Sequence, residues 1–596
     1  MLSCSLVRRS VLVSVVVALV AGVWVSAARP PKATGRAKFD SAVGRLAADA
    51  SNVRVIVRAE GGRREAVAAK LRGKGHALLA EHASIDSVSV ELPAAALEEL
   101  ASDPSVKRVS IDAEVKSFAD EVGTLDTNML LPTLGLPHEG FTGREVGVAV
   151  LDTGIVSHSE IPVAAFYDLR KGTKPTKPAD PFGHGTHVAG MIMDKQGHST
   201  ARYRSVAKGV RLIGLRVLDD SGSGYTSTVI SAIEFAIANK ATLGIDVLNL
   251  SLGHPIYEPA ATDPLVQAVE RAVAAGIVVV VAAGNEGMNR QTGEVGYAGI
   301  TSPGNAPSAI TVGAVDTKNT ITRLDDQVAT FSSRGPTWYD GYAKPDLVAP
   351  GRRVVSFMAK KSALYNQYPA YRVDVATRTY MTLSGTSMSA AVTSGVVALM
   401  IEASRSTNSQ NVALPPNAIK AILQFTAVPI AGADEITQGA GSLNAAGAVA
   451  LARSIDPTRP QGSWWLASGV SPFTQLPNGE SAPWSQQVFW GERVLTGDTV
   501  YVNHPAWTTA VVWGNAVVWG NAVVWGNAVV WGNAVVWGNA VVWGNSIVGY
   551  NADGTLIYGD AVDWSTVDPD AVVWGNVADQ VALLPARSTN FFTPVF

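Results

Sequence analysis

The sequence predicts an α/β fold built on a doubly wound, mostly parallel sheet. Short apolar runs, typical of strands buried on both faces, occur at residues 145–151, 211–217, 246–250 and 277–282. Helical patterns at 227–238 and 265–275 separate some of these runs, and strands that alternate with helices favour parallel pairing. Functional residues of such sheets gather beyond the carboxyl ends of the strands. Asp152, Ser251 and Asn285 stand at such ends.

Length, charge and cysteine content restrict the class of protein. A chain of 596 residues is too long for one core, so we expect two to four domains. Lys+Arg 47 against Asp+Glu 50 provides no basic surface for nucleic acid, so we expect no nucleic-acid partner. The single cysteine, Cys4, lies in the N-terminal apolar segment, so the mature protein is expected to contain no disulfide and no cysteine-bound metal.

Residues 1–28 have the pattern of a secretory signal peptide. Arg8 and Arg9 precede an apolar run from Val11 to Val25, and small residues follow as a cleavage site. The alternative is a short membrane anchor, although the run is shorter than the roughly 20 residues that a span needs. We therefore expect export, with membrane contact only during export, and a secreted extracellular protein or one associated with the cell surface.

An independent α+β unit follows the signal peptide. The pattern from residue 53 to residue 112 is strand, helix, strand, strand, helix, strand, which predicts a small ferredoxin-like domain. By itself this unit could have any function.

Three separated segments contain the residue types that serine hydrolysis needs. Asp152 ends the first apolar run, His184 stands between two glycines, and Ser387 lies at the start of an apolar helix. An imidazole can make a serine hydroxyl nucleophilic, and a buried carboxylate holds that imidazole in one tautomer. Alone, Ser387 would be read as a helix cap and His184 as a packed or metal-binding histidine. Together, in the order Asp, His, Ser, they predict a catalytic triad.

The motifs around these residues resemble those of the subtilisin-like serine proteases, the subtilases or peptidase family S8. Three signature blocks are matched by residues 152–154, 184–190 and 385–388. Residues 281–287, 331–336 and 344–351 resemble further blocks of the family. The resemblance covers about residues 120–450. It implies a subtilisin-like catalytic domain at 119–453, preceded at 29–118 by an inhibitory propeptide that assists folding and is cut away.

The resemblance also implies a role for each site residue. Asp152 orients His184, and His184 takes the proton of Ser387 and returns it to the leaving amine. Asn285 completes the oxyanion hole. The implied substrate-binding residues, which flank an extended peptide, are Gly222, Ser223, Gly224, Ser251, Leu252 and Gly253. The partners implied are protein or peptide substrates and the chain's own propeptide, and catalysis needs no cofactor. His187 and Asp346 are expected to be structural.

Two departures from the family pattern concern rigidity and metal binding. Ala391 stands where relatives have a proline, which removes a constraint on the helix start but no catalytic group. The calcium loop of some relatives is not recognisable at residues 194–199, and Glu160 is the only hint of a ligand. Structural calcium is therefore compatible with the sequence, but its ligands are not assigned.

The C-terminal part changes composition. Residues 454–509 are interpreted as a linker or small accessory segment, because prolines and a glycine mark a boundary near residue 457. Residues 510–596 contain an Ala-Val-Val-Trp-Gly-Asn repeat, with tryptophan at positions 513, 519, 525, 531, 537 and 543. A period of six is even, so a β conformation places these tryptophans on one face. The repeat is either a binding or surface-attachment module that contacts glycan or cell-wall material, or a low-complexity tail that is trimmed off.

The sequence thus predicts a secreted serine endopeptidase made as an autoprocessed zymogen. Two alternatives remain open: an inactive subtilase fold, and an attachment protein whose function lies in the repeat. An aspartic protease is excluded as an interpretation of Asp152-Thr153-Gly154, because the sequence has no second copy of that motif to share a proton with it.

Overall fold

The computed structural model describes residues 35–46, 52–118, 130–136, 140–195, 203–289, 292–375, 378–490, 493–508, 547–550 and 556–558. The expected signal peptide and most of the tryptophan repeat lie outside these residues. In the C-terminal region, β23 (Ile547–Tyr550) and β24 (Leu556–Tyr558) pair as antiparallel strands.

The central sheet has eight strands in the order β14-β13-β12-β10-β6-β8-β7, with β15 also paired to β13. All of its pairs are parallel except β13 with β14. Its strands are β6 (Gly147–Asp152), β7 (Val163–Asp168), β8 (Arg211–Arg216), β10 (Ile245–Leu250), β12 (Val278–Ala282), β13 (Ile310–Asp316), β14 (Gln327–Val328) and β15 (Leu347–Pro350). The predicted α/β class with a mostly parallel sheet is confirmed.

Helices cover both faces of this sheet because its strands are apolar on both sides. Val148 and Val150 of β6 belong to one buried cluster, whereas the intervening Ala149 and Leu151 belong to another. The first cluster includes residues of α5 (His184–Ile192), α10 (Thr386–Arg405), α11 (Pro416–Thr426) and α13 (Ala445–Ser454). The second includes residues of α6 (Thr226–Ala238) and α8 (Pro264–Ala274). Short helices α7 (Lys240–Leu243) and α12 (Glu435–Gln438) complete this part of the chain.

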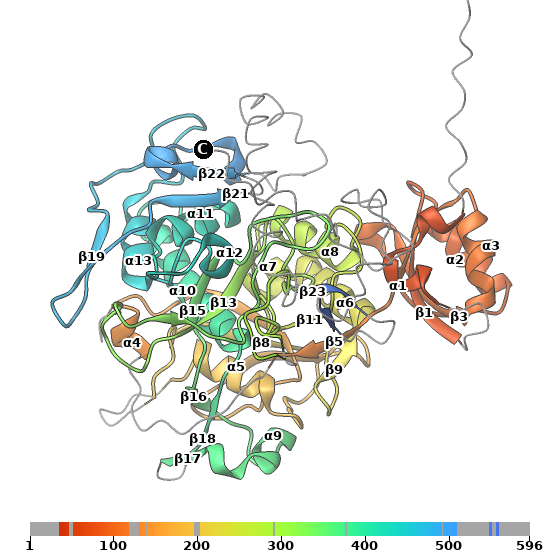
Figure 1. Ribbon diagram of the computed structural model, residues 1–596, viewed down its shortest axis with the longest axis horizontal. Helices are drawn as coiled ribbons and strands as arrows, with labels where there is room; N and C mark the ends of the chain where they lie inside the picture. The colour runs from red at the N-terminus through yellow and green to blue at the C-terminus, as the bar shows by residue number, and fades with distance from the viewer. Residues whose placement is uncertain are drawn as a thin grey trace, which may run out of the picture.

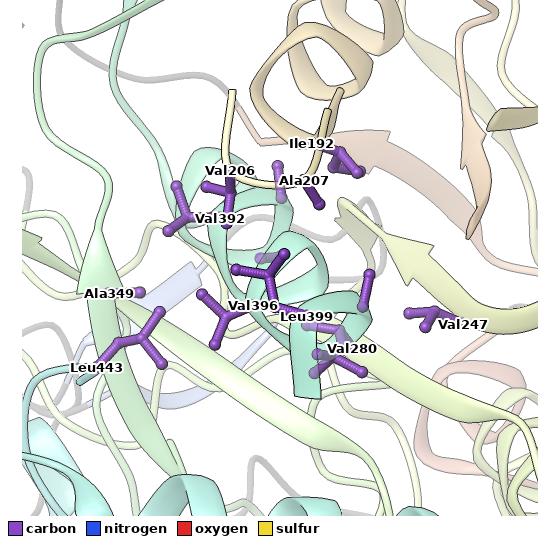
Figure 2. Packing of buried hydrophobic residues seen from close by; sticks show 14 of the residues in the cluster. Ile192, Val206, Ala207, Val247, Val280, Ala349, Val392, Val396, Leu399 and Leu443 are labelled. Carbon is purple, nitrogen blue, oxygen red and sulfur yellow. The ribbon is translucent and has the colours of Figure 1, made fainter. Parts of the chain in front are cut away.

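Helix α10 is the centre of the larger cluster. Val392, Val396 and Leu399 pack against side chains from the sheet and from the segment after α5, as Figure 2 shows. Among the described residues it is the one helix long and apolar enough to cross a membrane, but 94% of its apolar window is buried inside the protein. Ala391 is fully buried, and the helix runs without interruption from Thr386 to Arg405.

The N-terminal unit stands beside the main body (Figure 1). Its elements are η1 (Gly35–Lys38), α1 (Ser41–Gly44), β1 (Asn52–Ala59), α2 (Arg64–Gly73), β2 (Ala77–His82), η2 (Ala83–Ile85), β3 (Ser87–Pro93), η3 (Ala94–Ala96), α3 (Leu97–Ser102) and β4 (Val106–Ile111). The antiparallel sheet order β2-β3-β1-β4, with this sequence of strands and helices, is ferredoxin-like. A further strand, β5 (Glu114–Ser117), leaves the unit and enters the main body.

A small antiparallel sheet projects from the main body beneath α5 in Figure 1. It consists of β16 (Val354–Phe357), β18 (Arg378–Leu383) and β17 (Arg372–Val375), with α9 (Ala363–Gln367) and η4 (Pro369–Tyr371) in the connection. Because β18 ends at Leu383, this sheet leads directly into the segment that contains Ser387.

Residues 455–490 and 493–508 pack against the main body. Their elements are β19 (Phe473–Gln475), β20 (Ser481–Pro483), β21 (Gln487–Trp490), β22 (Arg493–Thr496), η5 (Gly497–Tyr501) and α14 (Pro505–Thr508). Trp465 and Trp507 are each 1% exposed, and the Trp465 indole N–H donates to the Val500 carbonyl at 2.8 Å. Phe425 of α11 contacts the rings of Trp484 and Tyr501. This segment therefore shares its core with the helices of the main body.

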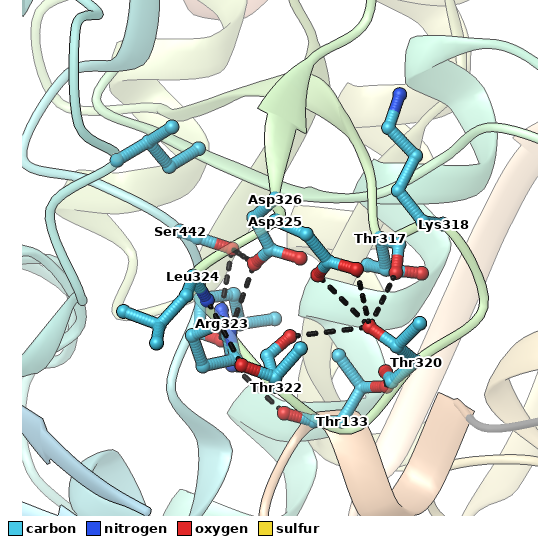
Figure 3. A network of polar contacts seen from close by, with 12 residues as sticks. Thr133, Thr317, Lys318, Thr320, Thr322, Arg323, Leu324, Asp325, Asp326 and Ser442 are labelled. Carbon is cyan, nitrogen blue, oxygen red and sulfur yellow. Dashed lines mark hydrogen bonds and ion pairs between the residues drawn. The ribbon is translucent and has the colours of Figure 1, made fainter.

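A polar network around residues 317–326 contacts Thr133 and Ser442, as Figure 3 shows. The Arg323 guanidinium donates to the Thr133 carbonyl at 2.8 Å and pairs with Asp326 at 2.9 Å. Thr133 ends α4 (Leu130–Thr133), the first described element after Phe118. The Arg323 backbone N–H and the Thr322 hydroxyl donate to Glu480, in the turn between β19 and β20. The network thus ties α4 and the β19–β20 hairpin to the main body.

Candidate active site

Asp152 and His184 form a buried pair at the carboxyl edge of the central sheet. Asp152 is the last residue of β6, and His184 is the first residue of α5. The Asp152 carboxylate oxygens lie 2.8 and 2.9 Å from His184 Nδ1, and both side chains are fully buried. The carboxylate accepts the Nδ1 proton, which leaves Nε2 as the basic nitrogen of a neutral imidazole.

The environment of His184 favours its protonated form. Burial disfavours the imidazolium, but the adjacent Asp152 carboxylate and then the charge of Asp180 outweigh that effect, so the pKa of His184 is raised above its usual value. An imidazole that gains a proton is therefore stabilised at this position, as a general base requires.

Ser387 is the second residue of α10 and is fully buried. Its hydroxyl donates to the Ser251 carbonyl at 3.1 Å, and the Ser251 hydroxyl donates to the Ser387 carbonyl at 3.1 Å. Within the described parts of the chain, no hydrogen bond joins His184 Nε2 to Ser387, and the Phe118 backbone lies close enough to His184 to favour its protonated form. The hydrogen bond between Ser387 and His184 is therefore not formed in this arrangement, in which a peptide segment fills the site.

That segment is β5, which lies between two strands of the main body in an antiparallel sheet of order β11-β5-β9. β9 spans Ser223–Tyr225 and β11 spans Leu252–Gly253. Val115 and Lys116 lie opposite Gly224 and Ser223, and Lys116 and Ser117 lie opposite Gly253 and Leu252. The Ser117 N–H also donates to the Gly222 carbonyl at 3.1 Å. Five of the six expected substrate-binding residues thus contact β5, whereas Ser251 contacts Ser387.

The residue after β5, Phe118, lies at the centre of the site. A Cβ atom added to Gly385 would come within 2.5 Å of the Phe118 carbonyl oxygen and 3.3 Å of Asn285 Nδ2. One added to Gly253 would meet the Phe118 ring at 2.9 Å. Gly385 has φ 153°, a conformation that side chains rarely adopt, so both its backbone and its surroundings require glycine.

Asn285 is held so that its amide nitrogen is available to the site. Its side-chain oxygen accepts from the Thr386 N–H at 3.1 Å and from the Thr386 hydroxyl at 3.0 Å. The nitrogen therefore lies on the side of Gly385 and the Phe118 carbonyl. In general, a fixed N–H donor near the N-terminus of a helix can stabilise negative charge that develops on a nearby substrate oxygen.

His187 and Asp346 are structural residues away from this centre. His187 Nε2 lies 3.0 Å from the Met381 carbonyl, and burial lowers the pKa of His187 to about 3. Asp346 pairs with Lys344 at 2.7 Å and with Lys420 at 3.0 Å. Among the residues that the structure covers, no group of three or more histidine, cysteine, aspartate or glutamate side chains could hold a metal ion.

Comparisons with known proteins agree with this geometry. Residues 143–449 match the model of the Subtilase family. The chain is 37% identical to serine protease AprX of Bacillus subtilis over 373 residues, which is 61% of this chain and 79% of that protein. It is 34% identical to subtilisin E of Bacillus subtilis over 55% of this chain and 74% of that protein. The fold is similar to that of fervidolysin from Fervidobacterium pennivorans, with a TM-score of 0.53, 22% identity, and coverage of 69% of this chain and 62% of that chain.

Proposed function

The chain belongs to the subtilase family of serine proteases, and on that premise we propose that it is a secreted endopeptidase made as an autoprocessed zymogen. The signal-like residues 1–28 support export. The observation that carries the zymogen proposal is the position of Phe118, which directly follows the substrate-like strand β5 and places its carbonyl oxygen beside Gly385.

In the proposed reaction, Ser387 Oγ attacks the carbonyl carbon of the substrate and His184 Nε2 takes its proton. The tetrahedral oxyanion is stabilised by the Asn285 amide and the Ser387 backbone N–H. His184 then gives the proton to the leaving amine, which breaks the peptide bond and leaves an acyl-enzyme. A water molecule, deprotonated by His184, attacks the carbonyl carbon of this ester, and His184 returns the proton to Ser387 Oγ as the bond to the acyl group breaks. Asp152 keeps Nδ1 protonated throughout, and the chemistry of these steps uses no cofactor.

Substrates are proposed to bind as β5 does. Pairing with β9 and β11 uses main-chain groups, so it tolerates many sequences. Selectivity comes from side-chain sites, and the ring of Phe118 beside Gly253 indicates that the residue before the cut can be a large aromatic one. The N-terminal unit, residues 29–118, then acts as a propeptide whose last five residues occupy the substrate position.

The first test maps the start of the mature protein. If the chain cuts itself in this arrangement, the purified mature protein begins at Ala119, because the Phe118 carbonyl oxygen lies beside Gly385, in the segment that leads into Ser387. Intact mass and N-terminal sequencing provide the readout. A mature protein that still contains residues 114–118 would contradict the proposed cleavage position.

The contact between the N-terminal unit and the main body contains buried carboxyl groups. Asp40 and Glu258 are each 3% exposed. Asp40 accepts from the backbone N–H groups of Val43 and Ile111, both at 2.6 Å. Arg108 of the unit pairs with Glu258 of the main body. The other titratable groups that face Asp40 and Glu258 are Arg45, Arg58, Asp263 and Tyr339.

These carboxyl groups make the stability of the contact between the N-terminal unit and the main body depend on pH. Burial, followed by the charge of Glu258, raises the pKa of Asp40 to about 7, and burial also raises the pKa of Glu258. After separation, both groups return toward their ordinary values near 4. The complex therefore holds protons that the separated parts release. Its extra stability is complete below about pH 4 and is lost as the pH rises to about 7.

We accordingly expect the cleaved N-terminal unit to bind more weakly as the pH rises from about 5 to about 7, by up to about tenfold per pH unit from Asp40, with Glu258 adding a change in the same direction. The dissociation constant is measured by dilution of the autoprocessed protein and rapid size-exclusion chromatography. Asp40→Asn should flatten this dependence. The matched control is Asp112→Asn, because buried Asp112 pairs with Arg54 and caps α6 in the same contact. That variant should weaken binding and keep the slope. A flat wild-type profile would contradict the expectation.

The second candidate function is attachment through the repeat. Two truncated chains distinguish it from proteolysis. A chain ending at Thr508 should fold and hydrolyse denatured protein, because the described residues of the site lie between Val115 and Ser387. A chain ending at Ser454 should lose several kcal/mol of stability, because it exposes the faces of α11 and α13 that Trp484 and Tyr501 contact. Thermal unfolding and casein hydrolysis are the measurements. Loss of hydrolysis with only the repeat removed, at unchanged stability, would favour a function that depends on the repeat.

A further inference from the structure

A second buried carboxylate lies beside the Asp152–His184 pair. Asp180 is 4% exposed and accepts four hydrogen bonds. Its Oδ1 accepts from the Thr153 hydroxyl at 2.8 Å and from the Gly183 N–H at 2.7 Å. Its Oδ2 accepts from the Thr186 N–H at 2.8 Å and from the Thr186 hydroxyl at 2.6 Å. No catalytic step described above uses this carboxylate.

The donors to Asp180 come from the two elements that carry the pair. Thr153 directly follows Asp152 at the end of β6, whereas Gly183 and Thr186 belong to the start of α5. The Thr153 hydroxyl donates its only proton to Asp180, and it accepts from the Gly185 N–H at 3.0 Å. The backbone on either side of the Asp152–His184 contact is therefore bound to one carboxylate.

The end of β6 and the start of α5 are in close contact here. A Cβ atom added to Gly185 would lie 2.1 Å from the Gly154 carbonyl oxygen and 3.0 Å from the Asp152 Cβ. The distance between Asp152 and His184 is thus sensitive to any shift of α5 relative to β6. Misplacement by about 1 Å can cost an enzyme about a hundredfold in rate.

Asp180 also contributes charge. Four donors surround its two oxygens, which is the pattern of an ionised carboxylate, and these hydrogen bonds oppose the effect of burial, which raises the pKa of Asp180. The charged or titratable groups that face His184 are Asp152, Asp180 and His187. In its ionised form, to which the four donors point, Asp180 is a second anion that favours a proton on His184.

We propose that Asp180 is a positioning residue for the reaction. Its hydrogen bonds hold the end of β6 and the first turn of α5 in a fixed relative position, and its negative charge favours the imidazolium of His184. This inference rests on the proposed triad. Positioning and charge make separable contributions, because Thr153 can be changed without loss of the Asp180 charge.

The test compares Asp180→Asn and Thr153→Val with the matched control Thr153→Ser, in otherwise wild-type protein. Asp180→Asn should lower kcat by about ten- to a hundredfold with KM within about twofold. It should also move the acid limb of kcat/KM to lower pH by about half a pH unit or more, because a negative charge near His184 is removed. Thr153→Val should lower kcat and leave the acid limb in place, and Thr153→Ser should retain activity.

The inference is overturned if Asp180→Asn keeps kcat within twofold, or if its acid limb does not move. If Asp180→Asn does not fold, Thr153→Val decides the positioning part, and an unchanged kcat overturns it. Failure of the proposed function itself looks different, since the wild-type protein would then hydrolyse no peptide.

Discussion

Ser387→Ala is expected to abolish peptide hydrolysis, with a loss in kcat on the order of 10⁶, and to leave the chain uncut after Phe118. The substitution removes the proposed nucleophile, a hydroxyl that among the described residues donates to the Ser251 carbonyl. The fold should therefore be retained, and β5 should stay between β9 and β11. The assays are hydrolysis of denatured casein and of a peptide with phenylalanine before the cut, together with the intact mass of the purified chain.

Ser389→Ala is the matched control for this experiment. Ser389 lies on the same helix, is fully buried, and donates to the Ala349 carbonyl at 2.9 Å. Its loss should change stability by about 1 kcal/mol and leave cleavage after Phe118 intact. A product of mature size from the Ser387→Ala chain, in the absence of any added protease, would show that another group cuts the chain.

Asp152→Asn is expected to lower kcat about 10⁴-fold with a smaller change in KM. The present carboxylate accepts the Nδ1 proton of His184 at 2.8 Å. An amide can present its N–H groups instead, which favours the tautomer with its proton on Nε2, where the base must be free. Steady-state kinetics between pH 6 and 10 would measure the loss, and part of the activity should return at high pH, where hydroxide can act as the base.

The matched control for Asp152→Asn is Asp168→Asn. Asp168 is a buried carboxylate at the end of β7 in the same sheet, and it pairs with Arg170 at 2.7 Å. Its replacement should affect stability and leave kcat within a few fold. Equal losses in the two variants would mean that Asp152 acts through the fold and not through His184.

The fold class was predictable because the strands of the central sheet are apolar on both faces, as Val146–Leu151 illustrates. The site residues lie in short family motifs, so their positions were predictable too, although their roles remain predictions. The strand conformation of β5 was not predictable. Glu114–Ser117 is short and has one apolar residue, and its strand conformation depends on pairing with β9 and β11. Local sequence contains no signal for that pairing.

Two other features depend on tertiary contacts. The hydroxyl of Thr153 and the carboxylate of Asp180 are 27 residues apart, so only the folded structure brings them together. Residues 454–509 were interpreted as a linker or small accessory segment from their prolines and glycine. In the structure, Trp465 and Trp507 are buried, because α11 and α13 present an apolar surface that the main body does not cover.

The central claim is that Ser387 is the nucleophile of a serine endopeptidase. Its most direct test is to treat the mature wild-type protein with a serine-directed phosphonate and to map the adduct by mass spectrometry. The structure predicts one adduct per chain, on the peptide that contains Ser387, with parallel loss of hydrolysis. An unmodified Ser387 in a protein that still cleaves peptides, or an inactivating adduct on another residue, would contradict the claim.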